Sequence, residues 1–339
     1  MKKKIFSIIK FIVPVVLLYY IFTIIDIDKL RTIVAESDPY LLSFIIFSVP
    51  LQYLFFTIRW AIIMRLIENV QANFFKLHAI LYKGLFVGFF VPGGVGIDVY
   101  RVLKVKKEYG VFKSNVSAIF LEKVIGTTSS LLLVLACYPF INVVENEILR
   151  TIINYSYIFV GIVCFAFIII ALKSSFVKGK IAGILNKVSI FFNIRIINLI
   201  NKISKGSNKI SKEDKVVQDI FKPLMDFKYI FIVLVFSLII LVIKAAFMNI
   251  VFRALGYELP LVANLFVVPL VNIISLIPVS FGGVGVRETA YIVLYAYFGM
   301  PSEGSLITSL ITFTFLLLNI SAGGLLMLKD NLKAKTNED

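Results

Sequence analysis

Long apolar runs separated by short polar segments set the pattern of this chain. About 20 apolar residues cross a hydrocarbon core of about 30 Å as a helix, and most of the runs reach that length. The longer runs are 5–25, 40–64, 116–140, 151–172, 229–252, 261–279 and 304–328. Two further runs, 77–91 and 286–298, are shorter. The pattern predicts an all-α, polytopic integral membrane protein with about eight spanning helices, which we expect to form a single membrane domain over residues 1–339.

Composition supports a membrane protein and gives no sign of a cofactor. Hydrophobic residues make up 59% of the chain and charged residues only 16%, whereas soluble domains carry about 25% charged residues. Cys137 and Cys164 both lie inside apolar runs, and His78 is the only histidine. These residues have neither the spacing of metal ligands nor that of a disulfide framework. We therefore predict no metal site and no cofactor.

The distribution of charge predicts the orientation of the chain. The net charge is +15, and residues 173–228 hold 12 Lys or Arg against 4 Asp or Glu. The loop 101–113 is also basic, whereas residues 26–38 are acidic. Because basic loops stay in the cytoplasm, we expect both termini inside the cell and the protein in the plasma membrane. The positive charge is accounted for by topology and anionic lipid headgroups, so nucleic acid is not predicted as a partner.

A first hairpin is predicted where only one short apolar run separates two cytoplasmic loops. The segment after Arg65 and the basic loop 101–113 should both be cytoplasmic, and only 77–91 lies between them. Fifteen helical residues rise about 22 Å, so this run can enter the bilayer before Pro92 breaks it. The sequence predicts a re-entrant hairpin over 77–106 with Gly93-Gly94-Val95-Gly96 at its tip. Such a tip must be surrounded by protein or by a water-filled cavity.

A second hairpin repeats the glycine motif from the opposite side. Gly282-Gly283-Val284-Gly285 interrupts residues 261–298, and the charge pattern has this hairpin approached from outside. Interrupted apolar segments at corresponding places in two halves are typical of inverted-repeat transporters with a midplane site. The halves would be 1–172 and 229–328. Chance recurrence of four residues is the alternative interpretation.

The basic connector 173–228 joins the predicted halves. Within it, residues 181–205 alternate Ile, Leu and Phe with Lys, Arg and Asn, a pattern that suits an amphipathic helix on the cytoplasmic leaflet. The segment could equally be a solvated spacer. A cytoplasmic partner docking on 173–228 is a further hypothesis.

Ionisable residues within hydrocarbon spans cost about 2.5 to 3.5 kcal/mol each on insertion scales, and they mark functional or paired positions. Helix N-termini and glycine-rich turns attract anions through their free N–H groups, and Arg and Lys bind phosphate with charge assistance. We therefore expect a lipid-headgroup site that combines such groups. Its candidate residues are Arg59, Lys83, Gly93, Gly94, Gly96, Asp98, Arg101, Glu122, Lys123, Lys244, Gly282, Gly283, Gly285, Arg287 and Glu288.

Structural roles compete with binding at several of these positions. Arg59 could reach the cytoplasmic interface with its long side chain, and Arg101 could pair with Asp98 on one helix face. Asp98 and Glu288 follow the glycines, so each could cap the helix that begins there. The sequence leaves capping and headgroup binding open. For Lys83 and Lys244, which apolar residues surround, a buried partner or a polar cavity is favoured over snorkelling.

Short motifs in a fixed order resemble a known family. Arg59-Trp60, PGGVGIDVYR at 92–101, LEKVIG at 121–126, GGVGVRETA at 282–290 and FGM at 298–300 are similar to the membrane region of lysylphosphatidylglycerol synthases, a family of flippase-like domains. The resemblance covers essentially the whole chain. It implies a multi-pass plasma-membrane protein that handles lipids with polar headgroups. The synthase activity of those enzymes resides in a separate soluble domain, which we do not expect here.

Two departures from the family pattern bear on the site. Relatives commonly have Glu-Arg at Glu122-Lys123, and the ammonium lacks the planar fork of a guanidinium. Relatives also tend to carry an Arg in their last helices, whereas residues 306–321 hold no charge. Contacts that relatives make through those two arginines are therefore not transferred to this chain.

The sequence favours a flippase-like transporter that moves a polar-headed, phosphate-bearing lipid between leaflets. Its partners would be membrane lipids, anionic or phosphate-bearing. A phosphate loop of the nucleotide type is excluded, because GGVG lacks the GxxxxGK[ST] pattern and no strand precedes it. One alternative is a membrane-embedded transferase acting on a lipid phosphate with Glu122 or Glu288 as base. Another is an accessory membrane protein that does not transport. No pair of nucleophile and base accompanies those carboxylates, so an enzyme is not favoured.

Overall fold

Every element in the described part of the chain is a helix, as the apolar runs predict. The computed structural model describes residues 26–91, 95–141, 227–275 and 284–336, with the single residues 23 and 151. The elements are α2 (Ile27–Ala35), α3 (Pro39–Phe44), η1 (Ile45–Phe47), α4 (Ser48–Glu68), α5 (Phe74–Phe89), α6 (Val95–Tyr109), α7 (Lys113–Cys137), η3 (Tyr138–Phe140), α11 (Phe227–Ala254), α12 (Leu261–Ile274), α13 (Val286–Ala296) and α14 (Ser302–Thr336).

Four helical stretches in the described residues are long and apolar enough to cross a membrane. They are Pro39–Glu68, Ser114–Phe140, Lys228–Ala254 and Ser302–Leu332. The predicted spans 5–25 and 151–172 and nearly all of the connector 173–228 lie outside the described residues, so the count of about eight spans stays a prediction. Within the predicted span 261–279, residues 276–279 lie outside the described residues, so the crossing of the bilayer by this run stays a prediction. The helix there, α12, has 14 residues, which rise only about 21 Å.

Local sequence signals set several helix ends. Asp38 accepts hydrogen bonds from the N–H groups of Tyr40 and Leu41, and Pro39 occupies the first turn of α3, where its missing N–H costs nothing. Asn73 caps α5 in the same way. At the other end of α4, Asn69 adopts a left-handed conformation with φ of 52°, which Asn tolerates better than most residues. Asn69 and Asn73 therefore bound the short turn between α4 and α5.

The first hairpin, α5–α6, is closely packed because glycines face each other across it. A Cβ at Gly96 would lie 2.8 Å from the Cα of Gly88, and one at Gly88 would lie 2.3 Å from Ile97 Cγ1. The predicted tip, residues 93–96, includes two residues too many, because Val95 and Gly96 already belong to the first turn of α6. Only 92–94 separate that helix from the described end of the first arm, and those three residues lie outside the described part.

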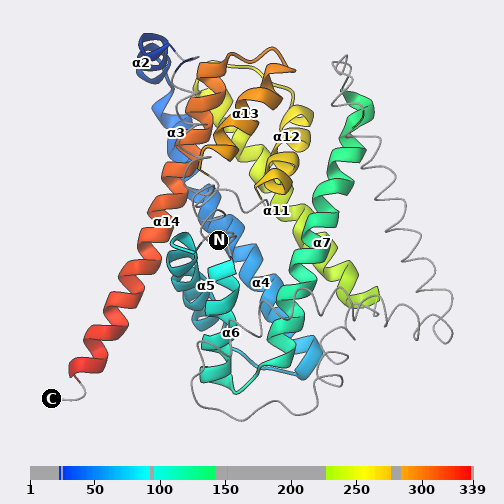
Figure 1. The fold of residues 1–339 in the computed structure, drawn as a ribbon, viewed down its shortest axis with the longest axis vertical. Coiled ribbons are helices and arrows are strands. Elements are labelled where there is room, and N and C mark those ends of the chain that lie inside the picture. The colour runs from blue at the N-terminus through cyan, green and yellow to red at the C-terminus, as the bar shows by residue number, and fades with distance from the viewer. Residues whose placement is uncertain are drawn as a thin grey trace, which may run out of the picture.

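The second unit repeats the order of the first with the opposite sense. Each unit has a long helix, two short helices around a GGVG motif and another long helix: α4 to α7, and α11 to α14. In Figure 1, α4 and α14 run downward, whereas α7 and α11 run upward. The hairpin α5–α6 lies in the lower part of the molecule and α12–α13 in the upper part. This is the geometry of an inverted repeat.

Each hairpin packs against the last helix of the other unit. Helix α5 contacts α14, and α12 contacts α7, in addition to their neighbours α4 and α11. Two apolar cores result. One surrounds Trp60 and Leu81 between α4, α5, α6 and α7, and the other surrounds Phe252 and Phe266 between α7, α11, α12 and α13. The two units are therefore interlocked.

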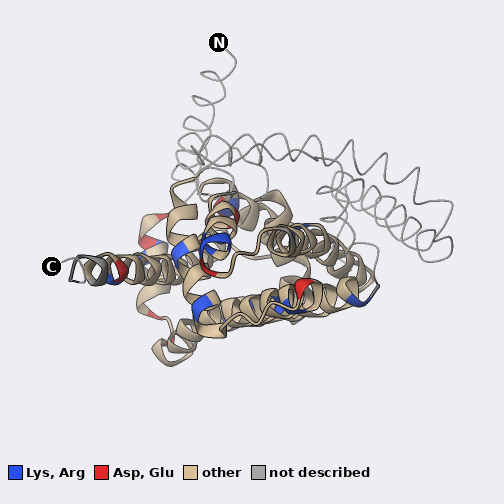
Figure 2. Ribbon diagram, turned by 90° about the horizontal axis from the view of Figure 1, so that it is seen from below, with Lys and Arg blue, Asp and Glu red and all other residues tan. Residues whose placement is uncertain are grey.

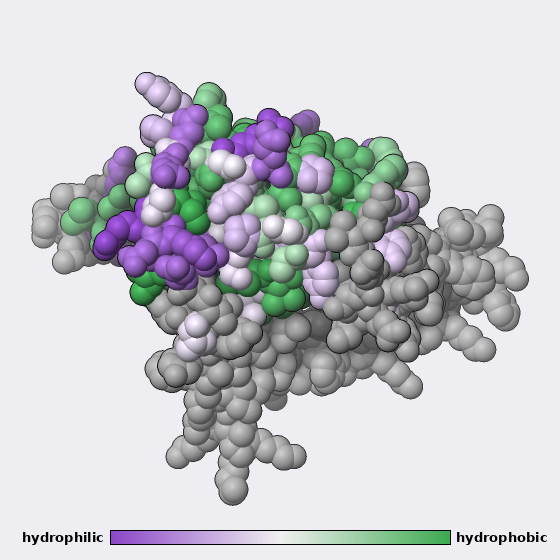
Figure 3. Space-filling view, turned by 90° about the horizontal axis from the view of Figure 1, so that it is seen from above, coloured by the Kyte–Doolittle hydropathy of each residue, from purple (hydrophilic) through white to green (hydrophobic). Residues whose placement is uncertain are grey.

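Charged positions are few on the described part of the bundle (Figure 2). Seen along its length, the ribbon carries only scattered charged positions on a predominantly uncharged scaffold (Figure 2). Figure 3 views the end where α2 lies and shows a hydrophilic area beside apolar surface. Charged side chains that lie inside the bundle are thus exceptions that need partners.

Candidate functional site

Three charged side chains from three helices meet in the interior of the first unit. Arg59 lies on α4, Arg101 on α6 and Glu122 on α7, and all three are buried. Arg101 Nη1 donates to Glu122 Oε2 at 2.9 Å, and Arg59 Nε lies 3.5 Å from Glu122 Oε1. Together with Asp98 and Lys123, these residues form what we term the Arg101 cluster.

Aromatic and amide groups hold Arg101 in place. Its guanidinium carbon lies 4.1 Å from the ring centre of Trp60 and 5.1 Å from that of Phe56, so both ring faces stabilise the cation. Asn115 accepts from the Trp60 indole N–H at 2.9 Å and donates to the Arg101 carbonyl at 3.2 Å. The side chain of Arg101 is 0% exposed. Its position is therefore fixed by packing on one side and by Glu122 on the other.

Two further charges extend the Arg101 cluster toward the surface. Asp98 Oδ1 lies 3.6 Å from Arg101 Nη1, which confirms the predicted pairing of these residues on one helix face. Lys123 is 56% exposed and lies 3.0 Å from Asp98 Oδ2. On the opposite side, Arg59 Nη1 donates to Ser237 of α11 at 2.7 Å. Arg59 is buried and bonded, so it does not snorkel.

The Arg101 cluster is incompletely satisfied. Among the described residues, Arg101 Nε and Nη2 are buried and have no hydrogen-bond partner, and Arg59 Nε and Glu122 Oε1 face each other at 3.5 Å as an ion pair without a hydrogen bond. Three cations face two carboxylates, which leaves one excess positive charge when all five groups are ionised. Buried polar groups without partners are costly and rare in native structures. The two free nitrogens of Arg101 form one edge of a planar fork that matches an oxyanion.

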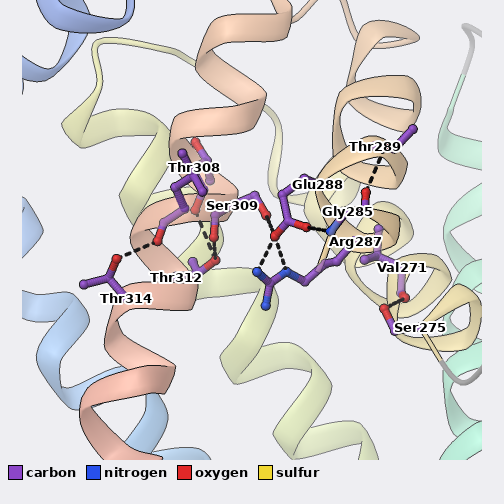
Figure 4. Close-up of polar contacts among 11 residues, drawn as sticks. Val271, Ser275, Gly285, Arg287, Glu288, Thr289, Thr308, Ser309, Thr312 and Thr314 are labelled. Atoms are coloured by element: carbon purple, nitrogen blue, oxygen red, sulfur yellow. Dashed lines mark hydrogen bonds and ion pairs between the residues drawn. The ribbon is translucent and has the colours of Figure 1, made fainter. Parts of the chain in front are cut away.

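A second charged group lies where the second hairpin resumes as α13 (Figure 4). Arg287 pairs with the buried carboxylate of Glu288, donating from Nε at 3.1 Å and also from Nη2. Ser309 of α14 donates to Glu288 Oε1 at 3.3 Å. The Arg287 guanidinium carbon also lies 4.5 Å from the ring centre of Phe313.

Glu288 has the capping role that the sequence left open. Its Oε2 accepts the backbone N–H of Gly285 at 2.7 Å, directly before the first turn of α13. Gly285 has a φ of 82°, in the left-handed region that glycine adopts without steric cost. Asp98 follows the same motif in the first unit, but its two carboxylate oxygens pair with side chains. The two motifs therefore support different local chemistry.

Lys244 has a partner inside the bundle, as predicted, whereas the partner of Lys83 is exposed rather than buried. Lys244 Nζ donates to Asn272 Oδ1 of α12 at 2.7 Å and lies within electrostatic range of Arg287. Lys244, Arg287, Glu288 and Ser309 form what we term the Arg287 cluster. Lys83 lies 2.5 Å from Asp330, which is 56% exposed near the end of α14. Lys83 is thus held by a peripheral ion pair between α5 and α14 rather than by either cluster.

The remaining candidates stay predictions. Gly93, Gly94, Gly282 and Gly283 lie outside the described residues, and Gly96 is in close contact with Gly88. In the described part of the chain, no group of His, Cys, Asp and Glu side chains could hold a metal ion. Binding of a headgroup by any candidate is still a prediction.

Sequence reasoning missed the neutral partners. Asn115, Ser237, Asn272 and Ser309 bond to charged or aromatic groups in the clusters. A sequence signal did exist, since Asn is rare in apolar helices and Asn115 and Asn272 both stand inside helices. Ser237 carried no such signal, because serine commonly satisfies itself with a carbonyl one turn earlier, as this residue also does.

Comparisons with known proteins agree with the fold. No curated protein and no solved structure gave a significant match to the chain. A family model described as "Lysylphosphatidylglycerol synthase TM region" matches residues 7–324, which include both clusters and both glycine motifs. The order of motifs, the helical bundle and this match converge. The chain belongs to the lysylphosphatidylglycerol synthase transmembrane-region family and is a polytopic helical membrane protein related to lipid handling.

Proposed function

We propose that the protein moves a polar-headed, phosphate-bearing lipid between the two leaflets of the plasma membrane. The headgroup would be held inside the bundle while the tails stay in the surrounding lipid. The observation that carries the proposal is the Arg101 cluster, in which two buried arginines share the one buried carboxylate of Glu122, and Arg101 keeps two guanidinium nitrogens without a hydrogen-bond partner among the described residues. A phosphate oxygen would supply the missing hydrogen-bond acceptors and the missing negative charge.

The surroundings of the Arg101 cluster favour a mobile ligand over a purely structural ion pair. A structural pair is stabilised when its remaining donors and acceptors are satisfied, and here the same buried pair leaves several unmet. The cluster also joins α4, α6 and α7 and reaches α11 through Ser237. A ligand that bound there would contact both units, which an alternating-access movement requires.

The orientation of the chain supports cytoplasmic termini. The last turn of α6 carries Lys106 and Lys107, and it lies at the same end of the molecule as the end of α14 (Figure 1). The acidic segment around α2 lies at the opposite end. Basic ends face the cytoplasm, so α14 would deliver the C-terminus inside.

A vesicle assay tests the proposal. The purified full chain is reconstituted into phosphatidylcholine vesicles containing a little phosphatidylglycerol that carries a fluorophore on one tail. A membrane-impermeant reductant then bleaches the outer leaflet, and protein-dependent bleaching of the inner pool measures transfer. We expect Arg101→Gln, which leaves Glu122 paired with Arg59, to slow transfer by about tenfold or more, since charge-assisted hydrogen bonds contribute about 1.5 to 3 kcal/mol.

The matched control is Lys104→Gln, which removes one positive charge from the same helix. Lys104 contacts the Tyr100 ring at 5.9 Å and belongs to neither cluster, so its loss should leave transfer unchanged. Transfer at the wild-type rate in Arg101→Gln would show that the Arg101 cluster does not bind the lipid. Wild-type vesicles that bleach no further than empty ones would reject transport of this lipid.

A further inference from the structure

The two units place the same kinds of charged group on equivalent helices. In the inverted repeat, α11 takes the place of α4, and α13 takes the place of α6. Arg59 and Arg101 lie on α4 and α6, and Lys244 and Arg287 lie on α11 and α13. Each pair of cations has one fully buried carboxylate, Glu122 or Glu288. The sequence treated all these residues as one site, whereas the structure separates them into two groups of matching chemistry.

The Arg287 cluster also carries an uncompensated cation. Glu288 is its only carboxylate and is already engaged by Arg287, by the Gly285 N–H and by Ser309. Lys244 has one hydrogen-bond partner among the described residues, the neutral amide of Asn272. A charged ammonium in the middle of the 28-residue helix α11, with no carboxylate bonded to it in the described part of the chain, is costly in a hydrocarbon layer. An anion would offset that cost.

The two clusters differ in accessibility. The Arg101 side chain is 0% exposed, whereas the Arg287 side chain is 14% exposed. Arg287 uses Nε and Nη2 on Glu288, and its third nitrogen, Nη1, has no hydrogen-bond partner in the described residues. In Figure 4 the guanidinium of Arg287 points away from α13 toward α14, with this nitrogen free of dashed contacts. A ligand can therefore reach Arg287 without the rearrangement that Arg101 requires.

We infer that Lys244 and Arg287 form a second phosphate site, which is the accessible one in this conformation while the Arg101 cluster is closed. The inference rests on the proposed function, because it makes the two clusters successive binding sites for the phosphate group of the transported lipid. In inverted-repeat transporters, alternating access arises largely because one repeat rocks against the other. After such a movement, the Arg101 cluster would open and the Arg287 cluster would close.

The experiment distinguishes lipid binding at the two clusters by using a fluorescent residue of the chain, Trp60, as a reporter. Trp60 is the only tryptophan, and it lies against Arg101, so its fluorescence responds to binding at the Arg101 cluster. The purified full chain in a neutral detergent is titrated with dioleoyl phosphatidylglycerol. Native mass spectrometry counts bound lipid while Trp60 emission follows the first cluster.

Lys244→Met is the decisive variant, because it removes the charge and leaves no buried carboxylate unpaired. Lipid bound at the Arg287 cluster should be counted by mass spectrometry without changing Trp60 emission. We expect Lys244→Met to weaken this binding by about tenfold and to leave the Trp60 response to lipid as in the wild type. The matched control, Arg253→Gln, removes a charge from the exposed end of the same helix and should bind as wild type. Lys244→Arg should retain binding, and Lys244→Gln replaces Lys244→Met if the latter does not fold.

Two outcomes overturn the inference. An unchanged lipid count and affinity in Lys244→Met would show that no phosphate binds there, and joint loss of both signals would show a single shared site. Competition with inorganic phosphate identifies the source of the ligand: displacement of the lipid assigns free phosphate, and retention assigns the lipid headgroup. Both of these support the site. If Lys244→Met binds lipid as the wild type does, the vesicle test of the Arg101 cluster still stands. Conversely, if the vesicles show no lipid transfer, the number of bound lipids measured by mass spectrometry does not change, so the two failures are distinguishable.

Discussion

The Arg101 and Arg287 clusters both hold charged side chains inside the helical bundle, but they draw these side chains from different arrangements of helices. In the first, the paired charges come from α4, α6 and α7, so the ion pair joins separate helices. In the second, Arg287 and Glu288 are adjacent on α13, and the contacts from α14 come from the uncharged side chains of Ser309 and Phe313. The ion pairs of the first cluster therefore hold separate helices together, whereas the ion pair of the second lies mostly within the first turn of one helix. Two substitutions test this difference, and two others at the contact between α5 and α14 set the scale; they follow in order of decreasing expected effect.

The largest effect is expected for Glu122→Gln. This change leaves Arg59 and Arg101 buried with their shared carboxylate gone, and removing one partner of a buried pair typically costs about 3 to 5 kcal/mol. Thermal unfolding in detergent should show a strongly lowered midpoint. Lys123→Gln, on the next residue but 56% exposed, should change it little. Equal midpoints for the two variants would mean that the first cluster does not hold the three helices together.

A smaller but clear loss is expected for Gly323→Ala, which tests how closely the first hairpin packs on α14. A Cβ at Gly323 would lie 2.0 Å from the Tyr82 carbonyl oxygen, so α5 and α14 must separate. Overpacking of this kind costs about 1 to 3 kcal/mol.

Gly126→Ala is the control for that prediction. The nearest atom to a Cβ there is Ser237 Oγ at 4.0 Å, and Ala replaces Gly in a helix interior with a gain of up to about 1 kcal/mol. The two changes should thus shift the unfolding midpoint in opposite directions. A loss from Gly126→Ala as large as that from Gly323→Ala would contradict the packing described for α5 and α14.

A moderate effect is expected for Glu288→Gln. The amide keeps an acceptor for the Gly285 N–H, but it loses the charge that balances Arg287. Because the pair lies within one helix start, we expect a cost of about 1 to 2 kcal/mol, less than for Glu122→Gln. Unfolding midpoints of the two variants, measured side by side, check the order. A reversed order would show that the second cluster, not the first, carries the tertiary coupling.

The smallest effect is expected at the Lys83–Asp330 pair. Asp330 is 56% exposed, and ion pairs open to solvent contribute about 0 to 1 kcal/mol. Asp330→Asn should leave the unfolding midpoint within that range. High salt should reduce the difference further, because exposed charges are screened. A midpoint drop that matched Glu122→Gln would place Lys83 among the essential buried charges.

The sequence predicted features that depend on composition along the chain. Apolar length located α4, α7, α11 and α14, and the glycines with Pro92 located both interruptions. Partners were harder, because a contact across helices depends on their rotation and separation. Asp98 and Arg101 were paired correctly since they share one face, whereas Glu122, the stronger partner of Arg101, lies 21 residues away. Asp330 lies 247 residues from Lys83, and no local pattern relates them.

The exchange of hairpins between units has a consequence for biosynthesis. Helix α5 leaves the ribosome long before α14, the helix into which its Tyr82 and Phe86 fit at Gly323 and Gly324. A re-entrant segment cannot rest against lipid with its broken backbone exposed. The nascent first unit must therefore be sheltered, by the insertion machinery or by shallow placement near the headgroups, until the last helix arrives. Completion of the chain, rather than insertion of each span, is the step that closes this fold.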